Sequence, residues 1–304
     1  MQELVSVVIP TCHRAGTLKR AMDSVLRQTY ESFEICVVLD GDDEETRDLV
    51  KRYISEDKPV RCVQTSGVGG SAARNLGVRM AQGEWIAFLD DDDEFLPTKL
   101  EKQLGLLGFD SEKRHLAFTS VLTYKPDKVD ARFVLPHVNW EETACSVGEY
   151  LFCRKGRRTM GFMQTSTLLI PRKILLEIPF TDGLKKHQDW DLLLRMEAAG
   201  VAIRHLESPE TIYHQHKMAA KHVGQQNAWR FSEEWMRSMP LADGARDAFV
   251  LSIVNRGIAT DSSMTIWERQ RELFKRFWKV HWRVKGAGSY VYMIGINLVR
   301  VYSK

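Results

Sequence analysis

The feature that most constrains the fold is a regular alternation of two patterns over residues 5–89. Short apolar runs typical of buried strands lie at residues 5–9, 33–39, 60–63 and 85–89. Between these runs, apolar side chains recur at helical spacing over residues 17–28, 44–54 and 71–81. Such β-α-β alternation predicts an α/β fold with a mostly parallel sheet and helices on both faces.

Beyond Pro97 the pattern is less regular. Strands are expected at 116–124 and 167–170, and a helix over 189–199, whereas residues 125–160 mix polar and aromatic residues without a clear period. The last part of the chain predicts a helical extension. We therefore expect a catalytic domain over 1–222, with a nucleotide-binding half of about 1–105 and an acceptor half of about 106–222, followed by a helical region over 223–304.

Composition excludes several classes of protein. The chain has 304 residues, of which 44% are hydrophobic, so general disorder is excluded. Its apolar runs all fall short of the roughly 18 residues that a spanning helix needs, and its N-terminus does not resemble a secretory signal. The five cysteines are scattered along the chain, which favours a reducing cytoplasm.

Polar clusters follow three of the expected strands. They lie at residues 11–14, 40–43 and 90–93. Because ligands of parallel α/β sheets bind at the carboxyl ends of the strands, these clusters predict a ligand site. The run of four aspartates, Asp90 to Asp93, supplies the hard oxygen ligands that suit Mg²⁺ or Mn²⁺. The alternative is that they cap a helix beginning near Pro97.

Several classes of nucleotide-binding protein remain to be separated. A P-loop NTPase is excluded because the chain contains no GxxxxGK[ST]. Residues 67–72, Gly-Val-Gly-Gly-Ser-Ala, fit the dinucleotide fingerprint G-x-G-x-x-A, with an acid about 20 residues further on at Asp90. That motif follows the third strand rather than the first, which leaves a nicotinamide-dependent oxidoreductase as an alternative.

The motifs taken in order resemble one family. They are Val5-Ser-Val-Val-Ile-Pro10-Thr11 with Arg14, Gln28-Thr29-Tyr30, Val37-Val38-Leu39-Asp40-Gly41, Ala73-Arg74-Asn75-Leu-Gly77, Gly83 to Asp93, and His187-Gln188-Asp189-Trp190-Asp191 with Arg195. Together they resemble the family 2 glycosyltransferases with the GT-A fold, which are inverting enzymes that use nucleotide-diphosphate sugars. The resemblance extends from residue 4 to about residue 220.

The resemblance implies a nucleotide site and a metal site. The nucleotide-binding candidates are Pro10, Thr11, Arg14, Asp40, Arg74 and Asp90. Asp40 corresponds to a carboxylate that binds uracil, although Leu39 stands where the family often has a second acid. Arg74 corresponds to a residue facing the phosphates, a role that suits a guanidinium. Asp92 is the expected ligand of Mn²⁺ or Mg²⁺, and His216 is a second candidate that aligns better than His214.

The resemblance also implies the catalytic base, Asp189, in a motif where Gln188 replaces the usual Glu. An inverting transfer needs a carboxylate to take the proton of the acceptor hydroxyl as it attacks the anomeric carbon. Asp191 is a supporting candidate, and Trp190 is a candidate for stacking on the acceptor or the sugar. The alternative for both acids is N-terminal capping of the helix that follows them.

The C-terminal region has its own charge pattern. Residues 267–304 contain nine Lys or Arg against two Glu, although the whole chain is near neutral. On a helical wheel Phe274, Phe277, Trp278, His281 and Trp282 fall on one arc, and Lys275, Arg276, Lys279 and Arg283 on another. This pattern predicts a helix lying on an anionic membrane surface, or else one packed on the catalytic domain.

The sequence therefore predicts an inverting, metal-dependent glycosyltransferase, either a hexosyl- or an N-acetylhexosaminyl-transferase. Its donor would be a UDP-sugar, and its acceptor a glycan or lipid-linked oligosaccharide in bacterial surface polysaccharide or O-antigen synthesis. We expect it at the inner face of the cytoplasmic membrane, without nucleic acid. The alternatives are the oxidoreductase and a non-catalytic, membrane-associated binding protein on the same fold.

Overall fold

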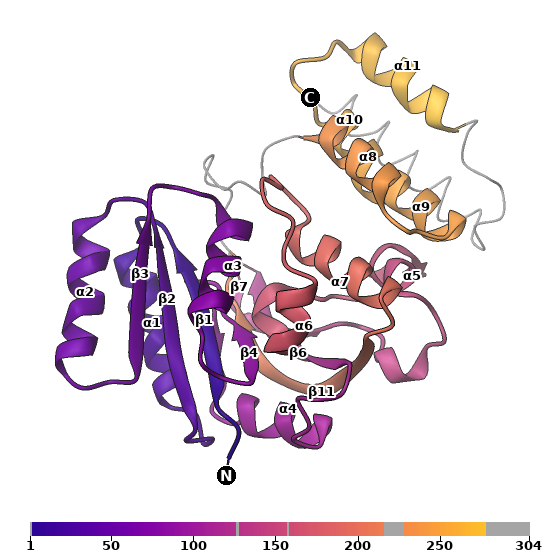
Figure 1. Cartoon of the computed structure of the whole chain (residues 1–304). Coiled ribbons are helices and arrows are strands. Elements are labelled where there is room, and N and C mark those ends of the chain that lie inside the picture. The colour runs from indigo at the N-terminus through magenta and orange to yellow at the C-terminus, as the bar shows by residue number, and fades with distance from the viewer. Residues whose placement is uncertain (1, 126–127, 157, 216–227, 278–304) are drawn as a thin grey trace. The chain divides into compact units, whose positions relative to one another are not determined.

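The computed structural model of the chain describes residues 2–125, 128–156, 158–215 and 228–277 (Figure 1). The chain divides into two compact units. The first comprises residues 1–143 and 163–217, and the second comprises residues 144–162 and 218–304. The expected boundary at residue 222, and the functions assigned to the two halves before it, stay predictions.

The first unit begins with the predicted alternation of strands and helices, which is confirmed. Its elements are β1 (Val5–Thr11), α1 (Ala15–Leu26), β2 (Phe33–Asp40), α2 (Glu44–Ser55), β3 (Val60–Thr65), α3 (Gly70–Met80) and β4 (Trp85–Phe88). The four strands are parallel and lie in the order β3-β2-β1-β4. Their carboxyl ends therefore lie at one edge of the sheet.

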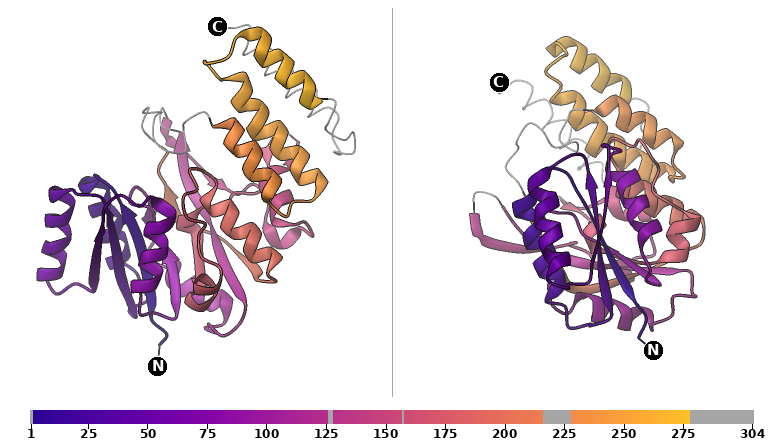
Figure 2. Two further views of the ribbon diagram at one scale, coloured as in Figure 1. Left: turned by 45° about the horizontal axis from the view of Figure 1, so that its top comes forward. Right: turned by 60° about the vertical axis from the view of Figure 1, so that its left-hand side comes forward.

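Helices cover both faces of these strands (Figures 1 and 2). Side chains of a strand alternate between the faces of a sheet. Val7 and Ile9 belong to one hydrophobic core with the apolar residues of α1 and α2. Val8 faces α3, where Gly77 allows close approach because a Cβ at this position would lie 2.4 Å from Val8 Cγ1.

Beyond β4 the sheet becomes mixed. Its further elements are β5 (Glu94–Phe95), α4 (Lys99–Leu107), β6 (His115–Lys125), β7 (Lys128–Leu135), η1 (Trp140–Glu142), η2 (Thr165–Thr167), β10 (Leu168–Pro171), α6 (Arg172–Glu177), α7 (Gln188–Ala198) and β11 (Ala202–Tyr213). Strand β10 is antiparallel to both β4 and β6, whereas β11 is parallel to β6. The strand order is β3-β2-β1-β4-β10-β6-β11-β5, with β7 added on β6.

The second unit is mainly helical, as predicted for the C-terminal region. Its elements are α5 (Val147–Phe152), β8 (Arg154–Lys155), β9 (Arg158–Thr159), α8 (Trp229–Ser238), α9 (Asp243–Phe249), the π-helix η4 (Val250–Val254), α10 (Asn255–Ala259) and α11 (Ile266–Phe277). Phe249 is central to the core of this unit. Its ring lies edge-on to Phe152 at 4.9 Å and 5.5 Å from that of Trp235.

One cation of the pattern predicted for helix α11 forms ion pairs. The sequence places Arg276 on the same arc as Lys275, and in the structure it bonds Glu233 of α8 at 2.6 Å and Glu272 at 2.8 Å. The pair with Glu233 links α11 to α8, whereas the pair with Glu272 lies within α11. The predicted residues Trp278, Lys279, His281, Trp282 and Arg283 lie outside the described residues.

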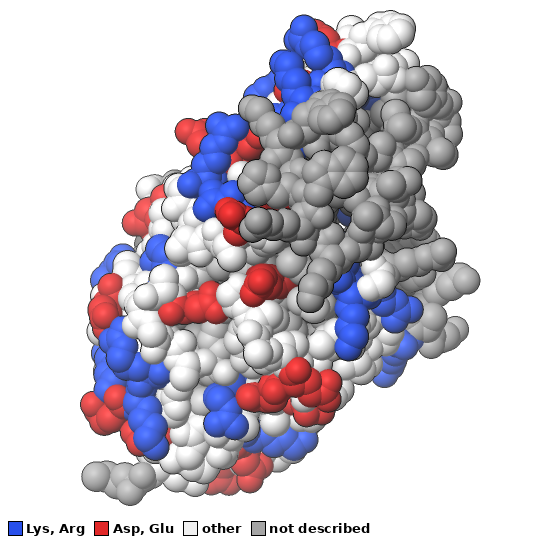
Figure 3. Space-filling view, turned by 90° about the vertical axis from the view of Figure 1, so that its right-hand side faces the viewer, with Lys and Arg blue, Asp and Glu red and all other residues white. Residues whose placement is uncertain are grey.

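None of the helices within the described ranges is long and apolar enough to cross a membrane. On the face drawn in Figure 3, acidic and basic side chains are interspersed over the described surface.

Candidate functional site

The candidate site lies within the first unit, at the carboxyl ends of β1 and β4. Thr11, the last residue of β1, donates a hydrogen bond from Oγ1 to Asp91 Oδ2 at 2.7 Å. Arg14 Nη1 donates to Asp91 Oδ1 and to Asp92 Oδ2, both at 2.9 Å. The first polar cluster therefore holds the acidic loop that follows β4, while Pro10 lies in β1 beside Val38 of β2.

Asp91, which the sequence motif leaves variable, is a buried anchor of this loop. Burial raises its pKa to about 6, and the bonds from Thr11 and Arg14 oppose that rise. Bonds of Asp90, Asp91 and Asp93 go to Arg74, Thr11, Arg14 and Ser166, and Thr98, which precedes α4, makes no side-chain cap. The capping alternative stays a prediction.

Arg74 connects the acidic loop to the start of α7. From α3 it donates Nη2 to Asp90 Oδ1 at 2.6 Å and Nη1 to Gln188 Oε1 at 2.8 Å. Its side chain is buried, and its Nε has no hydrogen-bond partner in the described part of the chain. A buried donor left in this way is the feature expected where a ligand oxygen binds.

Two residues of the site, Gln164 and Ser166, are not predicted from the sequence, and both bond Asp93 of the acidic run. Gln164 Nε2 donates to Asp90 Oδ2 at 2.8 Å and to Asp93 Oδ2 at 3.1 Å. Ser166 Oγ donates to Asp93 Oδ2 at 2.7 Å and accepts from Asp90 N at 3.0 Å. Asp93 itself is fully buried. The only signal was a short polar stretch before the apolar run of β10, which gives no indication of its partner.

The carboxylates crowd one another. Burial raises the pKa of Asp93 well above its usual value, and the charges of Asp90 and Asp92 raise it further. Burial also raises the pKa of Tyr213 to about 12, with the same carboxylates and Asp189 adding to the effect. A divalent cation would offset this excess of negative charge, and carboxylate oxygens are suitable donors for Mg²⁺ or Mn²⁺.

The donor chemistry therefore fits a cation, although a complete set of protein ligands is not assembled. Among the residues that the structure describes, no three His, Cys, Asp or Glu side chains are grouped to hold a metal ion. His216, the second candidate ligand, lies outside those residues. A site for Mg²⁺ commonly takes only one or two carboxylates from the protein, with phosphate oxygens and water completing the shell.

Asp189 lies in the first turn of α7 and is partly buried. Its Oδ1 accepts a hydrogen bond from Trp190 N at 3.0 Å. Burial raises its pKa to about 6; the Trp190 N–H and the charge of Arg74 lower it, whereas Asp90 raises it. A carboxylate with this pKa is ionised at neutral pH and can accept a proton there.

The neighbours of Asp189 have structural contacts. Asp191 is buried, accepts from Thr181 Oγ1 at 2.7 Å and from Arg195 Nε at 2.9 Å, and so holds α7 in place. The Trp190 ring stacks on that of His187 with centroids 4.8 Å apart. Burial lowers the pKa of His187 to about 3, so this ring is uncharged.

His214 is engaged through both ring nitrogens. Nε2 lies 2.8 Å from Glu94 Oε1, Nδ1 bonds the hydroxyl of Tyr124, and the backbone N–H donates to Asp93 Oδ1 at 3.2 Å. Both ring nitrogens of His214 are therefore engaged within the protein, and its backbone N–H contacts Asp93 of the acidic loop.

The glycine-rich loop binds Asp40. Val68 N donates to Asp40 Oδ1 at 2.6 Å and Gly69 N to Oδ2 at 2.9 Å. Gly69 has a φ of +87°, a conformation that favours glycine. The dinucleotide-like motif thus orients a carboxylate at the end of β2, which retains lone pairs for a further donor.

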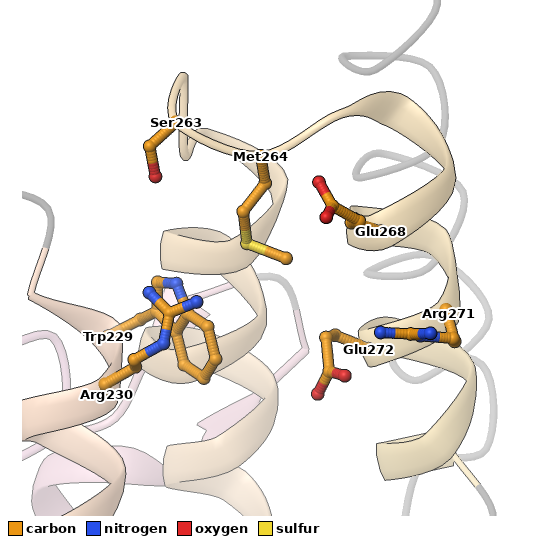
Figure 4. Close-up of a pocket in the computed structure, with 7 residues that line it drawn as sticks. All are labelled: Trp229, Arg230, Ser263, Met264, Glu268, Arg271 and Glu272. Atoms are coloured by element: carbon orange, nitrogen blue, oxygen red, sulfur yellow. The ribbon is translucent and has the colours of Figure 1, made fainter.

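A pocket of about 340 Å³ lies in the second unit (Figure 4). Its lining residues are Trp229, Arg230, Ser263, Met264, Glu268, Arg271 and Glu272. The acids of this pocket already have partners, because Glu268 accepts bonds from Thr265 and Glu272 pairs with Lys275 and Arg276. It shares no lining residue with the site around Asp189.

Comparison with solved structures shows the fold. The S. aureus TarS 1–349 complex with UDP-GlcNAc is similar at a TM-score of 0.61 and 15% identity, covering 98% of this chain and 81% of that one. Mannosyltransferase PcManGT from Pyrobaculum calidifontis, in complex with GDP-Man and Mn²⁺, is similar at 0.57 and 14%, covering 100% and 88%. The expected GT-A fold is confirmed.

Sequence comparison gives the family. Amylovoran biosynthesis glycosyltransferase AmsB of Erwinia amylovora is 29% identical over 252 residues, 80% of each chain. The UDP-Glc:alpha-D-GlcNAc-diphosphoundecaprenol beta-1,3-glucosyltransferase WfaP of Escherichia coli is 26% identical over 233 residues, 76% of this chain and 82% of WfaP. The profile of the family described as glycosyl transferase family 2 matches residues 6–174. The chain belongs to glycosyl transferase family 2.

Proposed function

We propose that this protein transfers a hexosyl or N-acetylhexosaminyl group, with inversion, from a UDP-sugar to a hydroxyl of a glycan acceptor. The observation that carries the proposal is the bridge through Arg74. One guanidinium bonds both Asp90, in the acidic loop, and Gln188, which directly precedes Asp189. The candidate donor site and the candidate base therefore adjoin each other within one unit.

Asp189 is the proposed catalytic base. Its pKa of about 6 leaves it ionised at neutral pH, so it can take the proton of the acceptor hydroxyl as the oxygen attacks the anomeric carbon. The bond that breaks joins the anomeric carbon to the diphosphate, which leaves from the opposite face. Trp190, stacked on His187, offers an aromatic surface for a sugar ring.

The nucleotide would bind across the ends of β1, β2 and α3. Thr11 and Arg14 contact the acidic loop, and Asp40 would present its carboxylate to the nucleobase. The buried Arg74 Nε, which has no partner among the described atoms, suits an oxygen of the diphosphate. Ser71 Oγ, also on α3, is a second buried group without a described partner.

Asp92 would hold Mn²⁺ or Mg²⁺, with His216 as the second candidate. When bound, the cation offsets the charge that develops on the leaving diphosphate. This part of the proposal is supported by the crowded carboxylates and by the Mn²⁺ named for PcManGT. Thr11 and Arg14 have a separate role, because their bonds to Asp91 and Asp92 hold the loop that carries Asp92.

The acceptor is proposed from the relatives. The name of AmsB refers to amylovoran biosynthesis, and that of WfaP to a sugar on diphosphoundecaprenol. A lipid-linked oligosaccharide of bacterial surface polysaccharide or O-antigen synthesis is therefore the proposed acceptor. Such an acceptor places the enzyme on the inner face of the cytoplasmic membrane.

Helix α11 is the proposed membrane contact. Trp267 is 80% exposed and Phe274 is 63% exposed, and the seven-residue spacing puts them on one face of the helix. The exposed cations Arg271 and Lys275 belong to the same helix. Exposed aromatic side chains beside cations are typical of helices that bind anionic lipid surfaces.

The nucleotide and metal parts of the proposal are tested by thermal unfolding. Wild type and Asp92→Ala would be heated with UDP, GDP, CMP or NAD, each with and without Mn²⁺. A ligand at a hundredfold excess over its Kd stabilises the folded state by about 2.7 kcal/mol. We expect a shift with UDP that depends on Mn²⁺ and is lost in Asp92→Ala. A shift with NAD alone would contradict the proposal, and so would the absence of a shift with any of the nucleotides.

Turnover then separates an enzyme from a binding protein on the same fold. UDP-sugars that shift the unfolding temperature would be incubated with lipid-linked oligosaccharide, and released UDP and elongated acceptor would be measured. Binding without turnover, across hexose and N-acetylhexosamine donors, would favour the non-catalytic alternative.

A further inference from the structure

Gln188 joins two parts of the site through its amide. Its Oε1 accepts from Arg74 Nη1 at 2.8 Å, while its Nε2 donates to Leu184 O at 2.8 Å. The two partners fix the orientation of the amide, because a guanidinium can only donate and a carbonyl can only accept. The oxygen of Gln188 therefore faces Arg74 and cannot exchange places with the nitrogen.

The same guanidinium bonds Asp90 at 2.6 Å from its other terminal nitrogen. Gln188 is neutral, so it holds Arg74 in place without neutralising its charge. A carboxylate in the same position would form a second ion pair with Arg74, and the cation would be shared between two acids. The space around the amide is small, since a Cβ on Gly70 would lie 3.1 Å from Gln188 Oε1 and 3.0 Å from Arg74 Nη1.

Charged groups on several elements act on the carboxylate of Asp189. Arg74 of α3 favours its ionised form, and Asp90, after β4, disfavours it. Tyr213 of β11 also faces it and stays protonated, because burial and the nearby acids raise its pKa to about 12. On its own segment, His187 is uncharged, and burial lowers the pKa of Lys186. Arg74 is thus the cation that this arrangement directs at Asp189.

We propose that Gln188 is a positioning residue: its neutral amide fixes Arg74 between Asp90 and the start of α7. The charge of Arg74, which is paired with Asp90 but not with residue 188, then acts on both the donor phosphates and the catalytic base Asp189. The inference rests on the proposed function, because it assigns Arg74 to the phosphates and Asp189 to proton removal. It predicts that the charge of residue 188, more than its shape, sets the behaviour of both groups.

The test compares Gln188→Glu, which keeps the shape and adds a charge, with Gln188→Met, which keeps the length and removes the bond without adding a charge. In Gln188→Glu the acid limb of the kcat profile should move to higher pH by about one unit, as expected for a like charge nearby. In Gln188→Met the limb should move less. A uniform structural effect would scale activity equally at every pH.

A second measurement needs no turnover. The carboxyl carbon of Asp189 would be followed by NMR in ¹³C-aspartate-labelled protein, assigned by its absence in Asp189→Asn. Its titration should follow the same order, with Gln188→Glu highest. This measurement still decides the inference if no sugar donor is turned over, a result that would count against the proposed function alone.

The donor side is tested by UDP binding in a double-mutant cycle with Arg74→Met. Gln188→Glu should raise the Kd for UDP by about three- to tenfold in the wild-type background, which lies within the range of coupling between contacting groups. It should change the Kd much less once Arg74 is absent. Superimposable titrations of Asp189 in all three proteins, or equal effects in both backgrounds of the cycle, would overturn the inference.

Discussion

Two arginines from different elements hold the acids that follow β4. Arg14 bonds Asp91 and Asp92, and Arg74 bonds Asp90. Closely spaced carboxylates repel one another, so these cations keep the loop in one arrangement before any ligand binds. A metal ion and a diphosphate would consequently meet a loop that is already ordered.

The acid in the first turn of α7 gives the sharpest prediction for a single residue. Since a base acts only when ionised, kcat should fall as pH drops through about 6 and level off above it, following the raised pKa of Asp189. Asp189→Asn should lower kcat by about a hundredfold to ten-thousandfold, the usual contribution of general base catalysis, with UDP affinity nearly unchanged. Loss of UDP binding in Asp189→Asn would mean that the residue is structural or binds the donor.

Close packing of α3 on the sheet gives a prediction for stability. In Gly77→Ala the new Cβ would lie 2.4 Å from Val8 Cγ1 and 3.3 Å from Val38 Cγ2. The helix must move away from the strands, so we expect a loss of about 1–3 kcal/mol in the free energy of unfolding. Gly105→Ala is the matched control in α4, where the Cβ meets nothing within 4 Å, and it should stabilise by up to about 1 kcal/mol. Urea unfolding measures both; equal effects would contradict the packing argument.

At the level of elements, the N-terminal half was largely predictable. Apolar runs and helical periodicities predict β1 to β4 and α1 to α3. Each of these elements buries a regularly spaced set of apolar side chains against elements that are near it in sequence. The expected helix over 189–199 is found as α7 over 188–198. Residues 125–160 gave no such signal. Elements η1, α5, β8 and β9 are short, and α5 packs on the distant α9, whereas β7 was missed although it pairs with the preceding strand β6.

The residues of the site likewise fall into those that the sequence predicts and those that it does not. Asp90, Asp92 and Asp189 are candidates from the sequence because they belong to motifs that are contiguous in the chain. Gln164 is 74 residues from Asp90, its partner. An isolated amide of this kind carries no periodicity and no composition signal, so only the folded chain indicates its role.

Helix α4 carries a buried cation that makes stability depend on pH. Lys99 is fully buried, donates from Nζ to Gln103 Oε1 at 2.5 Å and lies 4.2 Å from the centre of the Phe95 ring. Burial lowers its pKa to about 7, although the charge of Glu210 opposes this. Between pH 7 and the ordinary lysine pKa, the unfolded chain then binds more protons than the folded one, so stability rises with pH.

Lys99→Met should remove that dependence. The free energy of unfolding of wild type, minus that of the variant, should increase from pH 7 to pH 9.5. Chemical denaturation at several pH values, with the exposed Lys58→Met of the same unit as the control, measures the difference. A difference that stays constant or falls over this range would show that Lys99 keeps its charge in the folded state.

At the scale of the whole molecule, the two units carry separate proposals. The candidate transferase site is contained in the first, and the proposed membrane face is on α11 of the second. Point substitutions on α11 are preferable to deletion, because Arg276 bonds Glu233 and its loss would disturb α8 as well.

The membrane proposal predicts that Trp267→Ser combined with Phe274→Ser weakens binding to phosphatidylglycerol vesicles by about tenfold or more, since two large apolar contacts are removed. Arg271→Glu should weaken binding chiefly at low salt. Leu176→Ser, which removes an apolar side chain that is 50% exposed in the first unit, is the control. Co-sedimentation measures all three. Equal binding of wild type and the double variant would contradict the assignment of this face.

The pairing of α5 with α9 also has a consequence in time. Phe152 packs on Phe249, so the segment 144–162 completes its core only with residues made much later. At ribosomal speeds of about 5–20 residues per second, the delay between the two phenylalanines is roughly 5–20 s. During that interval α5 leaves the ribosome with its apolar side uncovered, although the strands and helices before it can already pair. Newly made chains should therefore be most dependent on chaperones after the sheet has formed and before α9 has been translated.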